Sequence, residues 1–188
     1  KKIEFSSKNN FSFNINRNLK FDNFKVESII DLNQLIFKEK YLKLKPYLPS
    51  LVEEINLKKH KIVINYNKNK FDIRGNGNIS LEKKLDNLSY QIIKNNNNIL
   101  FNSKINLKNN SLLIDFLDYE KKEDLNSLIS IKGSYEIGKK LRFDLFSVKE
   151  KNNEISIMGL DLNKNFKIID IESFNANYRN NKKILNKL

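Results

Sequence analysis

The stretch Phe71-Asp-Ile-Arg-Gly-Asn-Gly-Asn-Ile-Ser-Leu81 decides the fold class, because its residues alternate strictly between two chemical types. Successive side chains of a β-strand point to opposite faces of the sheet. One face of this segment carries the apolar or small residues Phe71, Ile73, Gly75, Gly77, Ile79 and Leu81. The other face carries the polar residues Asp72, Arg74, Asn76, Asn78 and Ser80. The segment therefore predicts a strand with one apolar and one polar side.

The same alternation recurs on both sides of this stretch and predicts further strands. Upstream, alternating rows begin at Phe11, Val26 and Ile62. Downstream, such rows occupy residues 88–92, 99–107, 112–116, 129–137, 141–145, 155–162 and 166–174. The parity of the pattern changes between Ile157 and Leu160, which indicates a β-bulge near Gly159.

The breaks between these rows are short and rich in Asn and Lys, which suits tight turns. They lie at residues 67–70, 95–98, 108–110, 138–140 and 151–153. Parallel neighbours need crossovers of about a dozen residues, so breaks this short join antiparallel neighbours. We therefore expect an all-β fold, an antiparallel meander of about ten strands that is strongly twisted and curled into an open groove.

Three segments depart from the alternation. Residues 39–58 contain both prolines, and Ser50-Leu-Val-Glu53 has the pattern of a capping box, which predicts one short helix near residues 50–57. Residues 118–128 are expected to form a loop or one helical turn. Residues 180–188 are expected to form a turn that leads into another strand.

The net charge of +13 reflects 35 Lys and Arg residues against 22 Asp and Glu residues. Asn, Ile, Lys and Phe, which have AT-rich codons, are all plentiful, so part of the lysine excess follows from codon usage. Arginine leads in specific contacts to bases and phosphates, yet only Arg17, Arg74, Arg142 and Arg179 are present. Most aromatic residues also lie on the apolar rows. We expect a solvated lysine surface, with an anionic membrane surface as a possible partner and no nucleic acid.

Other features of composition bear on the setting of the chain. There are no cysteines, so disulfides and thiolate metal sites are excluded. No run of 18 apolar residues is present, and the first 20 residues are polar and alternating rather than typical of a signal peptide. We expect residues 1–188 to be a single β-groove segment of a larger protein, with residues 39–58 as a short insert.

No group of residues predicts catalysis, a metal site or a cofactor. His60 lies in Lys-Lys-His-Lys without orienting partners, so an exposed residue is expected. Asp115, Asp118, Glu120, Glu123 and Asp124 lack the spacing of a calcium loop and predict a solvated loop. The pair Gly75 and Gly77 is no phosphate loop; it predicts either a bend in the sheet or a gap in the side-chain layer that admits a ligand.

The apolar rows are the remaining candidate site. If the apolar face stays open, it is expected to bind the acyl chains of lipid. The residues expected to line it are Phe71, Ile73, Gly75, Gly77, Ile79, Leu81, Tyr90, Ile92, Phe101, Ile105, Leu107, Ile131, Tyr135 and Phe143. If a second sheet covers the face, the same residues form an ordinary core, and periodicity alone does not separate these two cases.

The run Phe71-Asp-Ile-Arg-Gly-Asn-Gly-Asn-Ile79 resembles the AsmA-like bacterial envelope proteins, in particular their YhdP- and TamB-type members. Residues 112–120 (LLIDFLDYE) and 155–162 (ISIMGLDL) are also similar to segments of such chains, and the resemblance extends over residues 11–180. It implies a periplasmic protein, anchored to the inner membrane through a region outside this segment. It also implies a half-closed β-groove that adjoins other β segments of the same longer chain.

The resemblance carries no catalytic residues and implies a non-enzymatic function. The expected function is lipid binding within an apolar groove for phospholipid transport between the inner and outer membranes of a bacterial envelope. The alternative is a structural or adhesive β-sandwich domain that binds protein or glycan through its loops. An accessible apolar face favours the first function, and a closed, dry core favours the second.

Overall fold

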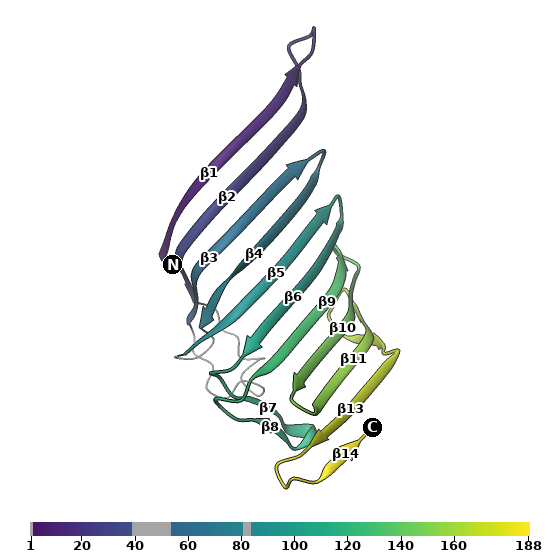
Figure 1. The fold of residues 1–188 in the computed structure, drawn as a ribbon. Coiled ribbons are helices and arrows are strands. Elements are labelled where there is room, and N and C mark those ends of the chain that lie inside the picture. Colours follow the sequence, from purple (N-terminus) through teal and green to yellow (C-terminus); the bar gives the residue numbers. More distant parts are fainter. Residues whose placement is uncertain (1, 39–53, 81–83) are drawn as a thin grey trace.

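The computed structural model describes residues 2–38, 54–80 and 84–188, and the findings below concern these residues. They form one open, twisted antiparallel sheet of 12 strands and a separate two-stranded sheet (Figure 1). Apart from one 3-10 turn, the described regular structure is entirely strand. The prediction of an all-β antiparallel meander is confirmed.

The strands follow one another in chain order across the large sheet, in the order β1-β2-β3-β4-β5-β6-β9-β10-β11-β13-β14, with β12 paired to β11. Their bounds are β1 Lys2–Ile15, β2 Phe21–Lys38, β3 Glu54–Asn67, β4 Lys70–Ser80, β5 Leu85–Asn95, β6 Asn98–Leu107, β9 Ser127–Glu136, β10 Lys140–Glu150, β11 Asn153–Asn163, β12 Ile168–Asp170, β13 Ser173–Arg179 and β14 Leu185–Lys187. The second sheet pairs β7, Leu112–Ile114, with β8, Tyr119–Lys121, around the 3-10 turn η1, Asp115–Leu117.

The register between strands brings the apolar rows onto one side of the large sheet. A single rung of Cα partners crosses seven strands through Ile64, Ile73, Ile92, Phe101, Gly133, Phe143 and Leu160. We call this side the apolar face. The adjacent rung on the opposite side, the polar face, runs through Asn65, Asp72, Ile93, Leu100, Ser134, Arg142 and Asp161. The alternation seen in the sequence thus becomes two distinct surfaces.

Bulges keep the apolar face continuous where the sequence parity changes. In β11, Gly159 has φ +62°, but the β10–β11 register continues past it without a shift. The bulge lies in the adjacent strand β10, where the β9–β10 register shifts between Phe143 and Leu145. A second bulge lies in β3, where the register to β4 shifts between Lys58 and Lys61, and Lys59 has φ +52°. An extra residue at each of these points returns the following apolar residues to the same side.

One end of the apolar face is covered by the segment that connects β6 to β9. Leu112, Ile114, Leu117 and Tyr119 from β7, η1 and β8 join residues of the large sheet in the core. The sheet contributes Ile55, Ile79, Leu107, Ile129, Val148, Ile155, Ala176 and Tyr178. The rings of Tyr119 and Tyr178 meet edge to face with centroids 5.7 Å apart. The hydrophobic core therefore lies between this small cover and one end of the large sheet.

Two hydrogen bonds fix the cover to the large sheet. The hydroxyl of Tyr178 in β13 donates to the carbonyl oxygen of Leu117 at 2.7 Å. The hydroxyl of Tyr119 in β8 donates to the carboxylate of Glu150 in β10, also at 2.7 Å. Both bonds are buried, and loss of either partner would leave a buried polar group unpaired.

The helix expected near residues 50–57 is wrong for residues 54–57, which belong to β3; residues 50–53 lie outside the described residues. Leu57 is the Cα partner of Leu35 in β2 and of Ile79 in β4, and Ile55 is buried in the core. The capping pattern favours a helix only through local hydrogen bonds. Pairing with two strands and burial of apolar side chains outweigh that preference.

Two further expectations need correction. The row at residues 112–116 is not a strand of the large sheet, because strand pairing stops at Ile114 and Phe116 is 71% exposed. The stretch 118–128, expected to be loop or helical turn, contains β8. At residues 180–188, expected to be a turn leading into another strand, the turn ends before Leu185 and β14 already lies within the segment. Within the described ranges, no helix is long and apolar enough to cross a membrane.

Candidate functional site

The residues expected to line a lipid groove lie on the apolar face, as the strand registers show for all of them except Leu81, which lies outside the described residues. The large sheet thus brings together side chains from β4, β5, β6, β9 and β10. Their degree of exposure differs along the strands. Ile79 is 7% exposed and Leu107 is fully buried, because both lie in the core under the β7–β8 cover. These two side chains are not available to line an open surface.

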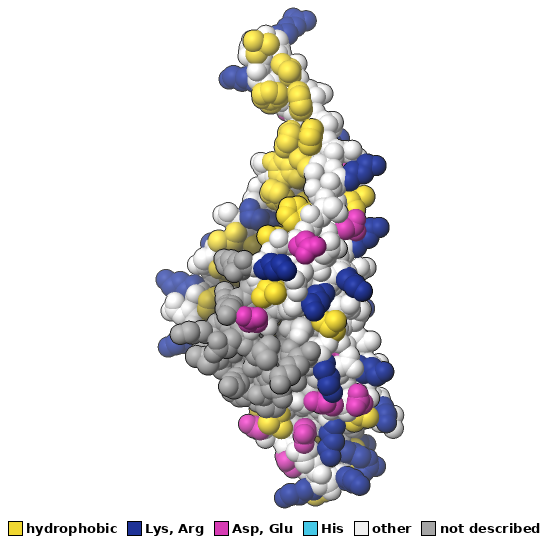
Figure 2. Space-filling view, turned by 90° about the vertical axis from the view of Figure 1, so that its left-hand side faces the viewer, with side chains coloured by type: hydrophobic (Ala, Val, Ile, Leu, Met, Phe, Trp, Pro, Cys, Tyr) yellow, Lys and Arg dark blue, Asp and Glu magenta, His cyan; other side chains and the backbone are white. Residues whose placement is uncertain are grey.

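The other end of the apolar face carries half-buried and exposed aromatic side chains. The rings of Tyr66 and Phe71 lie 4.6 Å apart across the β3–β4 hairpin, and Phe24 of β2 lies 6.0 Å from Tyr66. Phe71 is 38% exposed and Phe24 is 45% exposed. Figure 2 shows hydrophobic side chains as a band over the upper part of the molecule, where β1 and β2 lie. Apolar surface of this extent is costly to leave in water.

The glycines of the apolar face do not leave an empty gap, contrary to one of the two possibilities drawn from the sequence. A Cβ atom on Gly75 would stand 2.3 Å from the ring of Tyr90, and one on Gly77 would stand 2.4 Å from the ring of His60. Gly133 is covered in the same way by Phe101. Each glycine accommodates an aromatic ring of the protein itself, so the space expected for a ligand chain is already occupied.

His60 is buried rather than exposed, which corrects the expectation from its lysine-rich neighbours. Its ring is 1% exposed, lies over Gly77, and has its centroid 6.0 Å from that of Tyr90. Nε2 lies 2.9 Å from the carbonyl oxygen of Asn78, so Nε2 carries the proton and donates, since a carbonyl can only accept. Nδ1 has no hydrogen-bond partner among the residues that the structure describes. Burial lowers the pKa of His60, and the Asn78 carbonyl opposes this shift.

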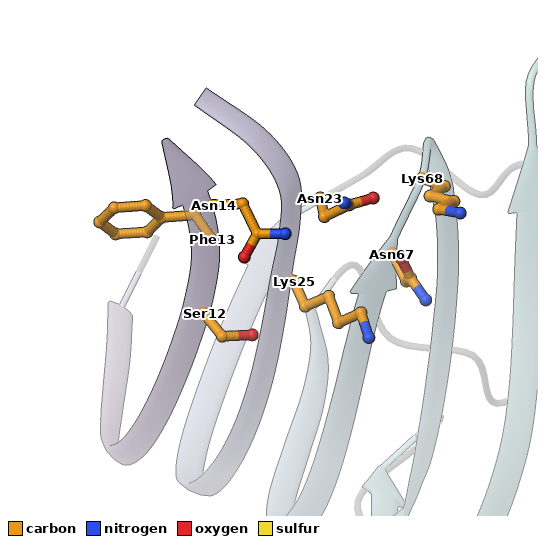
Figure 3. A pocket seen from close by; sticks show the side chains of 7 residues that line it. All are labelled: Ser12, Phe13, Asn14, Asn23, Lys25, Asn67 and Lys68. Atoms are coloured by element: carbon orange, nitrogen blue, oxygen red, sulfur yellow. The ribbon is translucent and has the colours of Figure 1, made fainter. Parts of the chain in front are cut away.

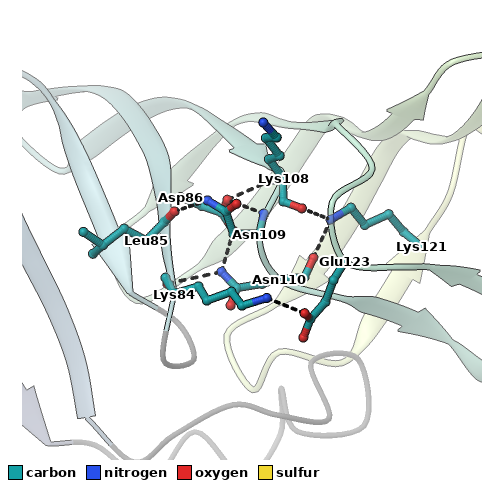
Figure 4. Close-up of polar contacts among 8 residues, drawn as sticks. All are labelled: Lys84, Leu85, Asp86, Lys108, Asn109, Asn110, Lys121 and Glu123. Atoms are coloured by element: carbon teal, nitrogen blue, oxygen red, sulfur yellow. Dashed lines mark hydrogen bonds and ion pairs between the residues drawn. The ribbon is translucent and has the colours of Figure 1, made fainter.

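A buried polar network lies beside the β7–β8 cover (Figure 4). The carboxylate of Asp86 accepts hydrogen bonds from the backbone N–H groups of Lys108 and Asn109, both at 2.8 Å, and from the side-chain amide of Asn110. The ammonium group of Lys121, whose residue is fully buried, donates to the carbonyl oxygens of Lys108 and Asn110. The network fastens the loop after β6 to the start of β5, which indicates a structural role.

The exposed charges near this network behave as a solvated surface. All five residues of the acidic segment, Asp115, Asp118, Glu120, Glu123 and Asp124, are exposed, as expected. Glu123 pairs with Lys84, and Asp118 accepts a hydrogen bond from the side chain of Asn181. No group of three or more His, Cys, Asp or Glu residues that could hold a metal ion is found among the described residues.

On the polar face, the side chain of Arg142 contacts three carboxylates. Its guanidinium pairs with Asp144 at 3.1 Å, with Asp161 at 3.2 Å, and with Glu172. Lys140 also pairs with Asp161 at 2.6 Å. These charges largely compensate one another, and the hydrogen bond that Arg142 donates to Glu172 raises the pKa of Arg142 further above its ordinary value. The cluster joins β10, β11 and the segment before β13.

A shallow polar depression of about 400 Å³ lies on the polar side of β1, β2 and β3 near their hairpin ends (Figure 3). Its lining residues are Ser12, Phe13, Asn14, Asn23, Lys25, Asn67 and Lys68. Figure 3 shows the ring of Phe13 pointing away from the other side chains. The depression therefore offers amides and two ammonium groups, and none of its lining residues is a carboxylate. No pattern within a single strand predicts this depression, because its lining comes from three strands and their turns.

Strand β1 forms one edge of the large sheet and has a neighbour on one side only within the described part of the chain. All 14 of its residues are exposed, including Ile3 at 60%, Phe5 at 52% and Phe11 at 69%. These three side chains are on the apolar face, since their Cα partners in β2 are Leu35, Leu32 and Val26. The apolar face thus continues to an open edge.

Comparison of the chain with protein-family models, curated proteins and solved structures finds no match in any of the three. The interpretation of the apolar face therefore depends on its geometry and chemistry.

Proposed function

We propose that the chain is a non-enzymatic lipid-binding segment whose apolar face holds phospholipid acyl chains. The observation that carries the proposal is the exposed end of this face, where aromatic and aliphatic side chains from consecutive strands form one surface without a second large sheet against it. Within the described residues, the separate sheet consists of β7 and β8 alone and covers the other end.

The energetic argument is the hydrophobic effect. Transfer of one methylene from water to an apolar surface stabilises by ~0.8 kcal/mol. An acyl chain with about ten methylenes on the face would therefore gain several kcal/mol, and the exposed rings of Phe24 and Phe71 would lose their contact with water. A broad apolar strip without directional polar groups lets such a chain slide along the sheet, since no single position is strongly preferred.

The resemblance to the AsmA-like envelope proteins, carried by residues 71–79, supports a proposal for the biological setting. On that basis we propose a periplasmic segment of a longer protein, anchored to the inner membrane through another region and adjoining further β segments. Phospholipid transport between the inner and outer membranes, as part of outer-membrane biogenesis, is the function proposed for the whole. The open edge at β1 supports the proposal that further β segments adjoin this one, because an unpaired strand edge can pair with another strand.

A structural or adhesive β-sandwich is the alternative function, and it requires a dry interior between two sheets. The covered end has such a packed interior between two sheets, with its core around Leu107 and Tyr119. The exposed end, with Phe24 and Phe71, favours lipid binding instead.

The two functions are separated by the lipid that co-purifies with the protein. We expect phospholipid in an organic extract of the purified chain, detected by mass spectrometry, and less of it for Phe71→Asp. Leu100→Asp is the matched control, because Leu100 is also an exposed apolar strand residue, at 52%, but lies on the polar face. A folded wild-type protein without lipid, or equal losses in both variants, would contradict the proposal.

A further inference from the structure

The turns at one end of the large sheet differ in charge from the connections at the other end. The hairpins β1–β2, β3–β4, β5–β6 and β9–β10 and the turn after β11 all lie along one edge, which we call the hairpin edge (Figure 1). Its turns are residues 16–20, 67–70, 95–98, 136–140 and 163–167. They contain eight Lys and Arg residues and one acidic residue, Glu136, which pairs with Lys139. The described connections at the opposite end, residues 84, 108–126, 150–153 and 180–184, contain seven basic and six acidic residues.

Two turns of the hairpin edge share one sequence pattern and one backbone structure. Residues 16–20 read Asn-Arg-Asn-Leu-Lys, and residues 163–167 read Asn-Lys-Asn-Phe-Lys. In the first, the side-chain oxygen of Asn16 accepts hydrogen bonds from the backbone N–H groups of Asn18 and Lys20. In the second, Asn163 does the same for Asn165 and Lys167. We call these two turns the tips.

Each tip presents a large apolar side chain in an unfavourable backbone conformation. Leu19 has φ +57° and Phe166 has φ +59°, in the left-handed region that bulky L-residues avoid and that Gly or Asn normally occupies. The side chains are 82% and 62% exposed, so no burial within the described protein compensates for this conformation. Strain held at an exposed position points to a function outside the fold.

A third turn shows that this backbone structure does not require an apolar residue. In residues 180–184 the side chain of Asn180 accepts from the N–H groups of Lys182 and Ile184 in the same manner, and Lys183 has φ +62°. This turn lies at the opposite end of the sheet and has a lysine at the position of Leu19 and Phe166. The apolar residues therefore distinguish the two tips of the hairpin edge.

We propose that the hairpin edge docks on the surface of an anionic lipid bilayer, with Leu19 and Phe166 inserted at the interface and the neighbouring basic residues against the headgroups. Exposed apolar side chains flanked by lysines suit such an interface. The polar depression beside the first tip adds Lys25 and Lys68, with amides that can donate to a headgroup phosphate. A polyanion such as nucleic acid would match the charge and could stack a base on Phe166, but it offers no apolar partner for Leu19.

The test is co-sedimentation of the full chain with vesicles of phosphatidylcholine and phosphatidylglycerol in equal amounts, compared with vesicles of phosphatidylcholine alone. We expect binding to the first that weakens as salt increases, and much weaker binding to the second. The double variant Leu19→Asn with Phe166→Asn should bind about tenfold more weakly, because apolar insertion is lost. Lys20→Gln with Lys167→Gln should weaken binding about fivefold for each lysine.

The matched control is Lys182→Gln with Lys183→Gln, which removes the same charge from the corresponding turn at the opposite end and should leave binding within twofold. Asn is favoured in the left-handed region, so the tip variants are expected to fold, as circular dichroism and thermal unfolding would verify. Unchanged vesicle binding in both tip variants would overturn the proposal. Tighter binding to a single-stranded oligonucleotide than to the anionic vesicles would also overturn it.

This inference does not depend on the proposed function. Docking on vesicles concerns the hairpin edge, whereas acyl-chain binding concerns the apolar face. Phe71→Asp should remove co-purified lipid and keep vesicle docking, and the tip variants should do the reverse.

Discussion

The ring of Tyr90 in β5 lies directly over Gly75 in β4, so that a Cβ atom at position 75 would stand 2.3 Å from Cζ and 2.4 Å from the hydroxyl oxygen of Tyr90. Gly75→Ala should therefore lower the free energy of unfolding by ~1–3 kcal/mol, since the ring must move out of its place. Chemical denaturation measures this loss. In a Tyr90→Ala background the added penalty of Gly75→Ala should largely disappear.

Gly133 provides a contrast, because its close neighbour is backbone. A Cβ atom there would stand 2.0 Å from the carbonyl oxygen of Arg142 and 2.7 Å from the ring of Phe101. Gly133→Ala should destabilise by ~3 kcal/mol or more, and Phe101→Ala should not relieve it, since the carbonyl remains. Relief at Gly133, or none at Gly75, would show that the rings are not placed as described.

Alternation in the sequence was sufficient to predict the strands and the two faces of the sheet, because the side-chain period of a strand is fixed by backbone geometry. Its change of parity near Gly159 indicated an irregularity, and the register shift lies next to it in β10. It did not reveal that the rings of Tyr90 and His60 occupy the space above Gly75 and Gly77. Which ring covers a glycine depends on the register between strands, and a single strand does not encode that register.

The charged neighbours of His60 predict an exposed side chain, and this prediction is wrong for a related reason. Lys59 adopts φ +52° at a bulge, and the bulge turns His60 onto the apolar face over Gly77. The cover formed by β7, η1 and β8 was missed as well, since the row Leu112, Ile114, Phe116 has the same period as a strand of the large sheet. Tertiary packing alone determines that Leu112 and Ile114 are buried while Phe116 is exposed.

The buried imidazole of His60 predicts a dependence of stability on pH. Its pKa in the folded protein is below the ordinary 6.5, so the unfolded chain binds a proton more readily. The stability that neutral His60 contributes is present above pH 6.5 and is lost as the pH falls through this value toward the lowered folded pKa. His60→Phe, which keeps a ring over Gly77, should remove this part of the dependence. Denaturation curves at a series of pH values would show it, and identical pH profiles would refute it.

Replacement of the buried Lys121 should lower the stability of the protein strongly. Lys121→Met leaves the carbonyl oxygen of Asn110 without this donor and removes one of the two donors to the carbonyl oxygen of Lys108, which still accepts from the backbone N–H of Asp124. The change should cost ~2–3 kcal/mol of stability. Lys122→Met is the matched control, because Lys122 is exposed, and it should change stability by less than about 0.5 kcal/mol. Urea unfolding monitored by circular dichroism measures both. A stable Lys121→Met variant would argue against the network as an anchor of the loop after β6.

Substitution of Leu19 should increase the stability of the protein. Leu19→Asn replaces a bulky residue at φ +57° by one that tolerates this conformation, and should raise the free energy of unfolding by ~0.5–1 kcal/mol. Phe116→Asn is the comparison, since Phe116 is similarly exposed but is not among the residues with positive φ, and no such gain is expected. Thermal unfolding of the two variants tests the difference. A loss of stability for Leu19→Asn would mean that the leucine contributes to the fold.

The most direct test of the central claim is photocross-linking with a phospholipid that carries a diazirine in its acyl chain, followed by peptide mass spectrometry. Lipid on the apolar face predicts adducts at residues such as Phe71, Ile73 and Phe101. It predicts none at Leu100 and Ile93, which are the neighbouring apolar residues on the polar face. Adducts distributed equally over both faces, or none on the apolar face, would contradict the claim that this face holds acyl chains.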